Sequence, residues 1–289
     1  MKRSIFRGAC VEMATPMRAD GSLDRERTME TAEELLGAGA DALLLASRTG
    51  EGASLSPEER LDLTAWCRRA ARGRLPILLD VSCSAALALR AKTAGADAAV
   101  LSPPPGLSQD ELFRALAHAA QEAGLPVLVR GEGKRIGLRT YRRLSALSSV
   151  CGVIEDGCDA GRLAGLRAAC GQLAVYADGD LGTAAALALG ARGAVSPLAN
   201  LVPGDAHRMC FSFFRGDAAL CQQDQLYWLP LIRALRPGAP AVKEALRLTG
   251  HGAGPCRGGK ALPPAAAKRL RAALRETGLL LDRFAENVG

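Results

Sequence analysis

Eight short apolar segments recur along the chain, and each is followed by a longer stretch with the composition of a helix. The segments show little alternation of apolar and polar residues, which is typical of strands buried on both faces of a parallel sheet. They are Ala9–Ala14, Asp41–Ala46, Leu75–Leu79, Ala96–Leu101, Leu125–Val129, Ser149–Ile154, Leu173–Tyr176 and Gly193–Val195. Strict repetition of strand and helix predicts an α/β fold, and eight repeats favour a closed (β/α)8 TIM barrel.

Local signals support several of the intervening helices. Ser56 is a suitable N-cap, Pro57 follows in the first turn, and Glu59 completes a capping box. Gly157 and Asp159 are alternative caps for the helix after the sixth apolar segment.

The repeats stop near residue 216. Three helices are expected beyond it, over Asp217–Leu235, Ala241–Leu248 and Pro263–Leu280. We therefore predict two regions, a barrel over 1–216 and a C-terminal three-helix appendage over 217–289.

Composition excludes several classes of function. Of the 289 residues, 48% are hydrophobic and 4% aromatic, which fits a globular chain but not a single-strand binder that stacks bases on exposed rings. The net charge of +7 comes from 37 basic and 30 acidic residues that are scattered along the chain, so we expect no nucleic-acid partner.

The cysteines indicate the redox state of the compartment, and the lengths of the apolar runs show whether a segment could span a membrane. Nine cysteines without a C-x-x-C pair indicate neither a disulfide framework nor a metal site, and they favour a reducing cytoplasm. No apolar run is long enough to span a membrane, and the N-terminus does not resemble a signal peptide, so we expect no membrane partner.

An ordered series of motifs resembles one known family. The motifs are Ala14-Thr15-Pro16-Met17, Thr49-Gly50-Glu51, Gly124-Leu125-Pro126, Gly152-Val153-Ile154-Glu155, Gly190-Ala191-Arg192-Gly193 and Pro240-Ala241-Val242-Lys243. Together they resemble the dihydrodipicolinate synthase and N-acetylneuraminate lyase family of class I pyruvate aldolases over nearly the whole chain. The resemblance implies a TIM barrel, a homo-oligomer (dimer or tetramer) and no cofactor.

The same resemblance implies a mechanism. In the family, a lysine on the sixth strand forms a Schiff base with pyruvate, and a tyrosine on the fifth strand transfers protons. A hydroxyl after the second strand supports the tyrosine, and an arginine after the fifth strand can bind a carboxylate. The iminium then acts as an electron sink.

This sequence departs from the family pattern where the chemistry occurs. The position of the Schiff-base lysine is Ile154, and that of the tyrosine is Arg130. The paired hydroxyls read Arg48-Thr49, so only the second remains, whereas Arg135 matches the carboxylate-binding arginine. Because isoleucine cannot form an imine, we predict a family member that lacks aldolase activity.

Two interpretations of the charged residues are open. Arg48, Arg130 and Arg135, with Thr49, could bind a small anion or keto acid at the barrel mouth. Alternatively, the arginines pair with carboxylates and fill an abandoned cavity; the candidate partners are Glu12, Glu51, Glu132 and Glu155. Glu51 and Glu155 are acid/base candidates or, alternatively, structural ion-pair partners.

Three functions are compatible with these residues. The first is an impaired homologue that binds a small anionic ligand or acts through a partner. The second is an active lyase or 4-hydroxy-tetrahydrodipicolinate synthase-like enzyme that condenses or cleaves pyruvate adducts with a repositioned base. Lys134 is a candidate for a substitute amine. The third is an enzyme that uses Schiff-base-independent chemistry in the same barrel.

Overall fold

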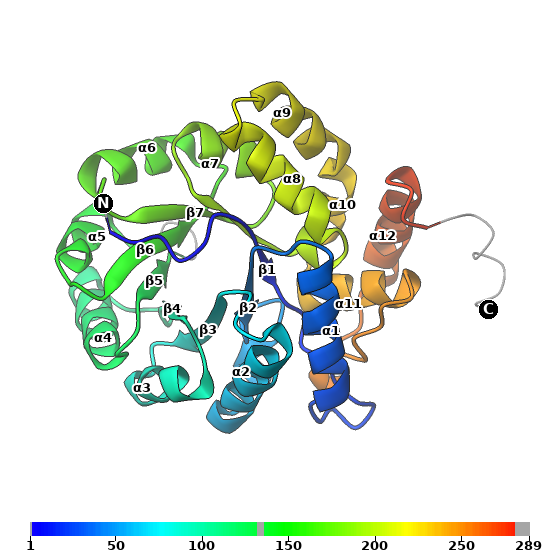
Figure 1. The fold of residues 1–289 in the computed structure, drawn as a ribbon, viewed down its shortest axis with the longest axis horizontal. Coiled ribbons are helices and arrows are strands. Elements are labelled where there is room, and N and C mark those ends of the chain that lie inside the picture. The colour runs from blue at the N-terminus through cyan, green and yellow to red at the C-terminus, as the bar shows by residue number, and fades with distance from the viewer. Residues whose placement is uncertain (1, 132–135, 281–289) are drawn as a thin grey trace.

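The chain folds into a closed barrel of eight parallel strands surrounded by helices (Figure 1), in a computed structural model that describes residues 2–131 and 136–280. The strands are β1 (Gly8–Glu12), β2 (Ala42–Leu45), β3 (Ile77–Ser82), β4 (Ala98–Leu101), β5 (Val127–Arg130), β6 (Val150–Glu155), β7 (Ala174–Asp178) and β8 (Gly193–Ser196). Pairing of β1 with β8 closes the barrel, which confirms the predicted TIM-barrel fold.

Eight helices alternate with the strands and cover the outside of the barrel. They are α1 (Arg25–Gly37), α2 (Pro57–Ala71), α3 (Ala85–Ala94), α4 (Gln109–Glu122), α5 (Leu138–Ser145), α6 (Ala160–Ala169), α7 (Thr183–Ala188) and α8 (Pro203–Phe214). The capping box of Ser56 and Glu59 opens α2 as expected. Of the two candidate caps for α6, Asp159 is the one that accepts a hydrogen bond from the helix.

The C-terminal region contains α9 (Ala218–Tyr227), α10 (Leu229–Ala234), α11 (Ala239–Leu248) and α12 (Pro264–Glu276). One helix was expected over Asp217–Leu235, and the structure has two, which separate at Trp228. Pro230 explains the break, because proline lacks an N–H and its ring would collide with the carbonyl of Leu226 in a continuous helix.

The C-terminal helices share a hydrophobic core with the barrel. Ala14 and Leu198, which follow β1 and β8, belong to the same buried cluster as Leu231, Val242 and Leu270 of the C-terminal helices. This cluster places the loop before α11 beside the C-terminal ends of the strands, where the barrel mouth opens.

The barrel interior changes character along its axis. The part near the N-terminal ends of the strands is apolar. There the N-terminal segment crosses the barrel (Figure 1), and the ring of Phe6 stacks on Tyr176 at a centroid distance of 4.1 Å. The part near the C-terminal ends of the strands carries charged side chains from the odd-numbered strands: Glu12, Asp80, Arg130 and Asp178. TIM barrels fill their interior with such layers, contributed by alternate strands.

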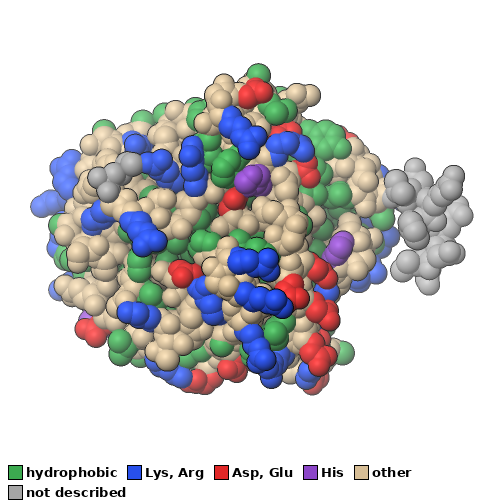
Figure 2. Space-filling view, in the orientation of Figure 1, with side chains coloured by type: hydrophobic (Ala, Val, Ile, Leu, Met, Phe, Trp, Pro, Cys, Tyr) green, Lys and Arg blue, Asp and Glu red, His purple; other side chains and the backbone are tan. Residues whose placement is uncertain are grey.

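On the face that carries the N-terminal segment, lysine and arginine side chains are scattered among acidic and neutral ones (Figure 2). Within the described residues, no helix has both the length and the apolar composition that crossing a membrane requires. The cysteines all lie in the described part of the chain, and all of them are free thiols.

Candidate functional site

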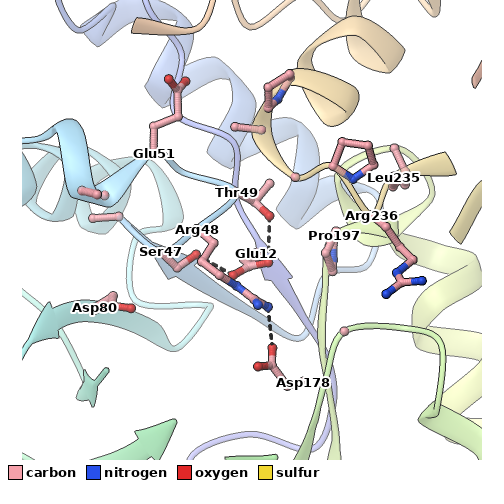
Figure 3. Close-up of a pocket in the computed structure, with 18 of the residues that line it drawn as sticks. Glu12, Ser47, Arg48, Thr49, Glu51, Asp80, Asp178, Pro197, Leu235 and Arg236 are labelled. Carbon is pink, nitrogen blue, oxygen red and sulfur yellow. Dashed lines mark hydrogen bonds and ion pairs between the residues drawn. The ribbon is translucent and has the colours of Figure 1, made fainter. Parts of the chain in front are cut away.

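A cavity of about 900 Å³ opens at the C-terminal ends of the strands (Figure 3). Carboxylates of Glu12, Asp80 and Asp178 line it, together with the hydroxyls of Ser47 and Thr49. Active sites of TIM barrels lie at this end, because the loops that follow the strands converge there. The cavity is therefore the candidate functional site.

Arg130 lies beneath the cavity and is fully buried. Its Nη2 lies 2.5 Å from Oδ1 of Asp178, and its Nε donates to Oδ2 of the same carboxylate at 3.1 Å. Nη1 lies 2.8 Å from Oε1 of Glu12 but is not aligned for a hydrogen bond, so this contact is an ion pair only. Burial by itself would lower the pKa of Arg130, but the two carboxylates outweigh it and raise this pKa.

Two hydroxyl groups donate hydrogen bonds to Glu12, which is also ion-paired with Arg130. Ser47 Oγ donates to its Oε1 at 2.9 Å, and Thr49 Oγ1 donates to its Oε2 at 2.7 Å. The hydroxyl of Thr49, a predicted binding residue, is therefore already engaged with the protein.

Arg48 lies above this buried layer and is 59% exposed. Its Nη2 donates to Oδ1 of Asp178 at 3.0 Å (Figure 3). Nη2 of Arg130 donates to the same oxygen, so the two arginines converge on one carboxylate. Burial would raise the pKa of Asp178, but the two guanidinium groups hold it below its usual value. Arg135, the third predicted arginine, lies outside the described residues.

Asp178 is not among the site residues predicted from the sequence. The signal that could have found it is its position at the last residue of β7, because polar side chains at that end of a barrel strand face the mouth.

Ile154 is fully buried at the next-to-last position of β6. Its cross-strand partners are Arg130 on β5 and Tyr176 on β7. It belongs to the apolar cluster inside the barrel and does not line the cavity. None of the eight described strands contains a lysine.

Glu155, next to Ile154, is held between β6 and the surrounding helices. Its carboxylate receives Nε and Nη2 of Arg162 at 2.5 and 2.7 Å and the hydroxyl of Tyr141. Burial and the Glu155 charge raise the pKa of the Tyr141 phenol well above its usual value. Successive side chains of a strand point to opposite faces, which separates Glu155 from the barrel interior.

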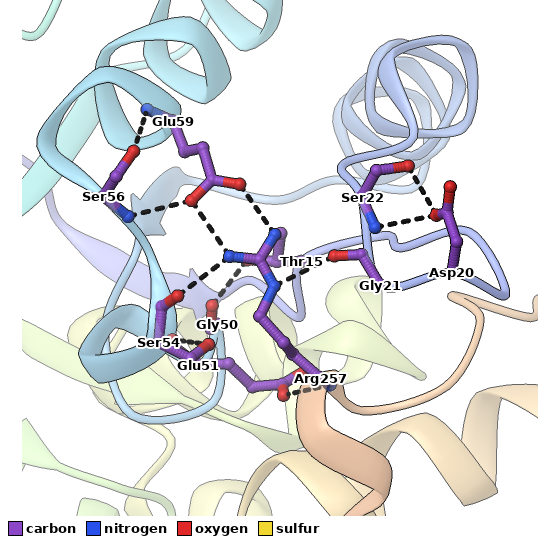
Figure 4. A network of polar contacts seen from close by, with 10 residues as sticks. All are labelled: Thr15, Asp20, Gly21, Ser22, Gly50, Glu51, Ser54, Ser56, Glu59 and Arg257. Atoms are coloured by element: carbon purple, nitrogen blue, oxygen red, sulfur yellow. Dashed lines mark hydrogen bonds and ion pairs between the residues drawn. The ribbon is translucent and has the colours of Figure 1, made fainter.

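Glu51 connects the wall of the cavity to the C-terminal region. Its Oε1 lies 2.6 Å from Nζ of Lys243, and its Oε2 accepts from the backbone N–H of Arg257 at 2.9 Å. Arg257 in turn donates to both carboxylate oxygens of Glu59 and to the carbonyl of Gly21 (Figure 4). These partners give Glu51 a structural role at the edge of the cavity.

Two further buried carboxyls line the cavity. Asp80 accepts from the backbone N–H of Ser82 and from Ser102 Oγ, both at 2.8 Å. Asp180 accepts from the backbone N–H of Leu198 at 2.9 Å. Burial raises the pKa of Asp80, and it raises the pKa of Asp180 to about 6.

Backbone strain is concentrated around the cavity. Four non-glycine residues of the described chain have positive φ, and three of them line the cavity: Ala46 at 55°, Glu51 at 56° and Ser82 at 53°. Such conformations cost of the order of 1 kcal/mol each and cluster at functional sites.

Among the described residues, no group of histidine, cysteine and acidic side chains could hold a metal ion.

A model of the dihydrodipicolinate synthetase family matches residues 5–270. The chain belongs to this family. The 4-hydroxy-tetrahydrodipicolinate synthase of Acidithiobacillus ferrooxidans is 32% identical over 225 residues, which cover 74% of this chain and 77% of the relative. That of Lachnoclostridium phytofermentans is 27% identical and covers 96% of this chain and 100% of the relative.

Solved structures of dihydrodipicolinate synthases have the same fold as this family member. That from Aquifex aeolicus superposes with a TM-score of 0.90 at 23% identity, over 96% of this chain and 100% of that one. The chloride-inhibited enzyme from Acinetobacter baumannii, complexed with pyruvate, gives a TM-score of 0.86 at 25% identity, over 95% and 99%.

Proposed function

We propose that this family member does not form a pyruvate Schiff base at its barrel centre and that its cavity binds a small carboxylate ligand. The observation that carries the proposal is Ile154, a fully buried hydrocarbon at the position of the family's lysine. A Schiff base requires an amine that can attack a ketone, and this side chain has none.

The layer above Ile154 supports the proposal. Arg130 occupies the position of the family's tyrosine, and its guanidinium is ion-paired to Glu12 and Asp178. Glu12 and Asp178 line the cavity whereas Ile154 does not, so a ligand at the barrel mouth meets these carboxylates and not Ile154.

The cations at the mouth favour a carboxylate ligand. Arg48 lines the cavity, and toward the described residues only its Nη2 donates a hydrogen bond, so its other N–H groups are available to a ligand. Arg236 and Lys260 are exposed on the C-terminal side of the same cavity. A forked guanidinium matches the geometry of a carboxylate.

Borohydride reduction in the presence of pyruvate tests the chemistry directly. We expect no covalent adduct by intact mass, whereas an active synthase treated in parallel acquires reduced pyruvate. An adduct on any lysine overturns the proposal and supports the alternative of an active lyase. Peptide mapping would then assign the adduct, with Lys260 in the cavity wall and Lys134 outside the described residues as the first positions to inspect.

Thermal-shift measurements test ligand binding. Keto acids and dicarboxylates should include a compound that raises the melting temperature of the wild type but not that of Arg48→Ala. Arg139→Ala is the matched control, because Arg139 is exposed on α5, away from the cavity. If no carboxylate stabilises the wild type, the ligand-binding half of the proposal is wrong.

A second candidate is an enzyme with Schiff-base-independent chemistry, which the two buried carboxyls Asp80 and Asp180 in the cavity wall favour.

We further propose a cytoplasmic homo-oligomer. A structural neighbour at 24% identity is a monomeric dihydrodipicolinate synthase variant. Light scattering on the purified chain therefore decides the oligomeric state.

A further inference from the structure

A connecting segment over residues 250–263, here called the strap, joins α11 to α12 and forms one wall of the cavity. Its residues Cys256, Arg257 and Lys260 line the cavity. The opposite walls come from the loops that follow the strands. The cavity is therefore enclosed on one side by a segment that is not part of the barrel.

Arg257 fastens the strap to the barrel (Figure 4). Its Nη1 and Nη2 donate to the two carboxylate oxygens of Glu59, in the first turn of α2, at 2.9 and 2.7 Å. Its Nε donates to the carbonyl of Gly21 at 2.9 Å, and Nη1 also donates to that of Ser54 at 2.8 Å. Its backbone N–H donates to Oε2 of Glu51. One residue thus ties the strap to the loops after β1 and β2.

Three further hydrogen bonds from the rest of the chain end on carbonyls of the strap. They run from Met17 N to Ala253, from Arg27 Nε to Gly252 and from Lys243 Nζ to Pro255. Arg257 alone donates five. Among the described contacts, Arg257 is therefore the main fastening of the strap.

Apolar burial contributes little to holding the strap. Of residues 250–263, all of which the structure describes, only Ala253 and Cys256 are buried. The side chains of Arg257 and Glu59 are 23% and 30% exposed. Polar contacts with access to water stabilise weakly, because water replaces them when they break. A segment held in this way opens locally at a lower free energy than the whole fold unfolds.

Glycines flank the fastened part of the strap. Gly250 follows α11, and Gly258 and Gly259 follow Arg257; their φ values are 86°, 71° and 68°. A Cβ at any of the three would meet no atom within 4 Å, so their surroundings do not hold them in this conformation. Glycine moves between left- and right-handed conformations at little cost. Residues 251–257 therefore lie between two hinge positions.

We propose that the strap is a gate of the cavity, in which residues 251–257 move away from the barrel by local opening and Arg257 is the latch that keeps them closed. Opening withdraws Cys256 and Arg257 from the cavity wall and widens the entrance on the C-terminal side. The gate goes beyond the proposed function, because it does not depend on which ligand the cavity binds.

The thiol of Cys256 reports the opening. It is 8% exposed in the closed strap, and burial together with the Glu51 carboxylate raises its pKa. Because the thiolate is the reactive form, the closed gate protects this thiol. Cys67 on α2 provides an internal reference, since it is fully buried in the barrel core and reacts only when the barrel unfolds.

The test is labelling of the full chain with N-ethylmaleimide at about pH 8, near the ordinary pKa of a thiol. Peptide mass mapping gives the separate rates for Cys256 and Cys67. In the wild type we expect Cys256 to react at least ~10-fold faster than Cys67, because it requires local opening only.

Two variants weaken the latch from its two sides. Arg257→Gln should accelerate the labelling of Cys256 by ~10-fold or more, because most of the fastening contacts are lost. Glu59→Gln leaves the strap sequence intact and keeps an acceptor for the Ser56 N–H, and it should accelerate the labelling by ~2–5-fold. Arg269→Gln is the matched control, because Arg269 is exposed on α12, and it should leave the rate unchanged.

A core variant separates local opening from global unfolding. Ile77 is fully buried on β3, and Ile77→Val should accelerate the labelling of Cys67 by ~2–10-fold. The rate of Cys256 should not change, because the open gate retains the barrel core.

Three results overturn the gate. Equal wild-type rates for Cys256 and Cys67, or equal acceleration of both by Ile77→Val, would show that the strap leaves the barrel only when the whole fold unfolds. An unchanged Cys256 rate in Arg257→Gln would show that Arg257 is not the latch. None of these results bears on the proposed function, which borohydride trapping and thermal shifts test separately.

Discussion

Ile154 on β6 and Arg130 on β5 are direct cross-strand partners, and neither side chain reaches solvent. A hydrocarbon and an ion-paired guanidinium thus occupy the positions where the family resemblance places an amine and a phenol. The two substitutions are physically compatible, because a buried ammonium beside Arg130 would suffer like-charge repulsion.

That compatibility predicts the effect of restoring the lysine alone. Ile154→Lys should lower the free energy of unfolding by about 3 kcal/mol or more, because it buries an uncompensated charge next to a guanidinium. Urea denaturation followed by circular dichroism measures the loss.

The double variant Ile154→Lys/Arg130→Tyr separates this repulsion from a simple loss of packing. The new ammonium could then take over part of the neutralisation of Glu12 and Asp178. We expect the double variant to be more stable than the sum of the single losses by at least about 1 kcal/mol. Strict additivity would contradict the coupling.

Glu155 should contribute to stability and not to ligand binding. Glu155→Gln removes the charge that Arg162 and Tyr141 share, which should cost about 2–4 kcal/mol in the free energy of unfolding. Thermal shifts produced by cavity ligands should remain as in the wild type. Glu122→Gln, on the exposed end of α4, is the control and should change neither measurement. A variant that unfolds normally but loses ligand binding would show that Glu155 belongs to the site.

The carboxyl of Asp180 should make stability depend on pH in a defined window. Its folded pKa of about 6 lies above the ordinary value of 3.8, so between these values the folded state binds more protons than the unfolded state. The free energy of unfolding therefore decreases as pH rises through this window and is not affected further above it.

Asp180→Asn should remove this pH-dependent loss of stability. In the wild type the loss, relative to low pH, amounts to up to about 3 kcal/mol near neutral pH. The measurement is the difference in unfolding free energy between wild type and variant across the window. Asp62→Asn is the control, because Asp62 is exposed on α2, and it should keep the wild-type slope. Identical slopes for wild type and Asp180→Asn would show that the Asp180 carboxyl is not perturbed.

The shared core predicts that the C-terminal region and the barrel unfold together. We interpret 1–216 and 217–289 as regions of one cooperative unit, because Lys243 is ion-paired to Glu51 across them. The fluorescence of the two tryptophans reports the unfolding of different regions: Trp66 lies on α2, and Trp228 lies at the junction of α9 and α10. In each of Trp66→Phe and Trp228→Phe, the fluorescence of the remaining tryptophan should change at the same urea midpoint as the circular dichroism of that same variant. A fluorescence midpoint that differs from the circular dichroism midpoint of the same variant would indicate two independent units.

The repetition of apolar strands and amphipathic helices was sufficient to predict the barrel, because period and length are local properties of the chain. The capping box at Ser56 was predictable for the same reason. The break between α9 and α10 was visible as Pro230, although a single helix was expected there.

The position of Ile154 at the sixth strand was also apparent from the sequence, as was the absence of an amine there. What only the tertiary structure decided is how the charged residues are paired. Arg48 and Arg130 meet at Asp178, and Glu51 is engaged by Lys243 from the far end of the chain. These pairings follow from the closure of the barrel and the docking of the C-terminal helices, and no local pattern encodes distances between segments so far apart in sequence.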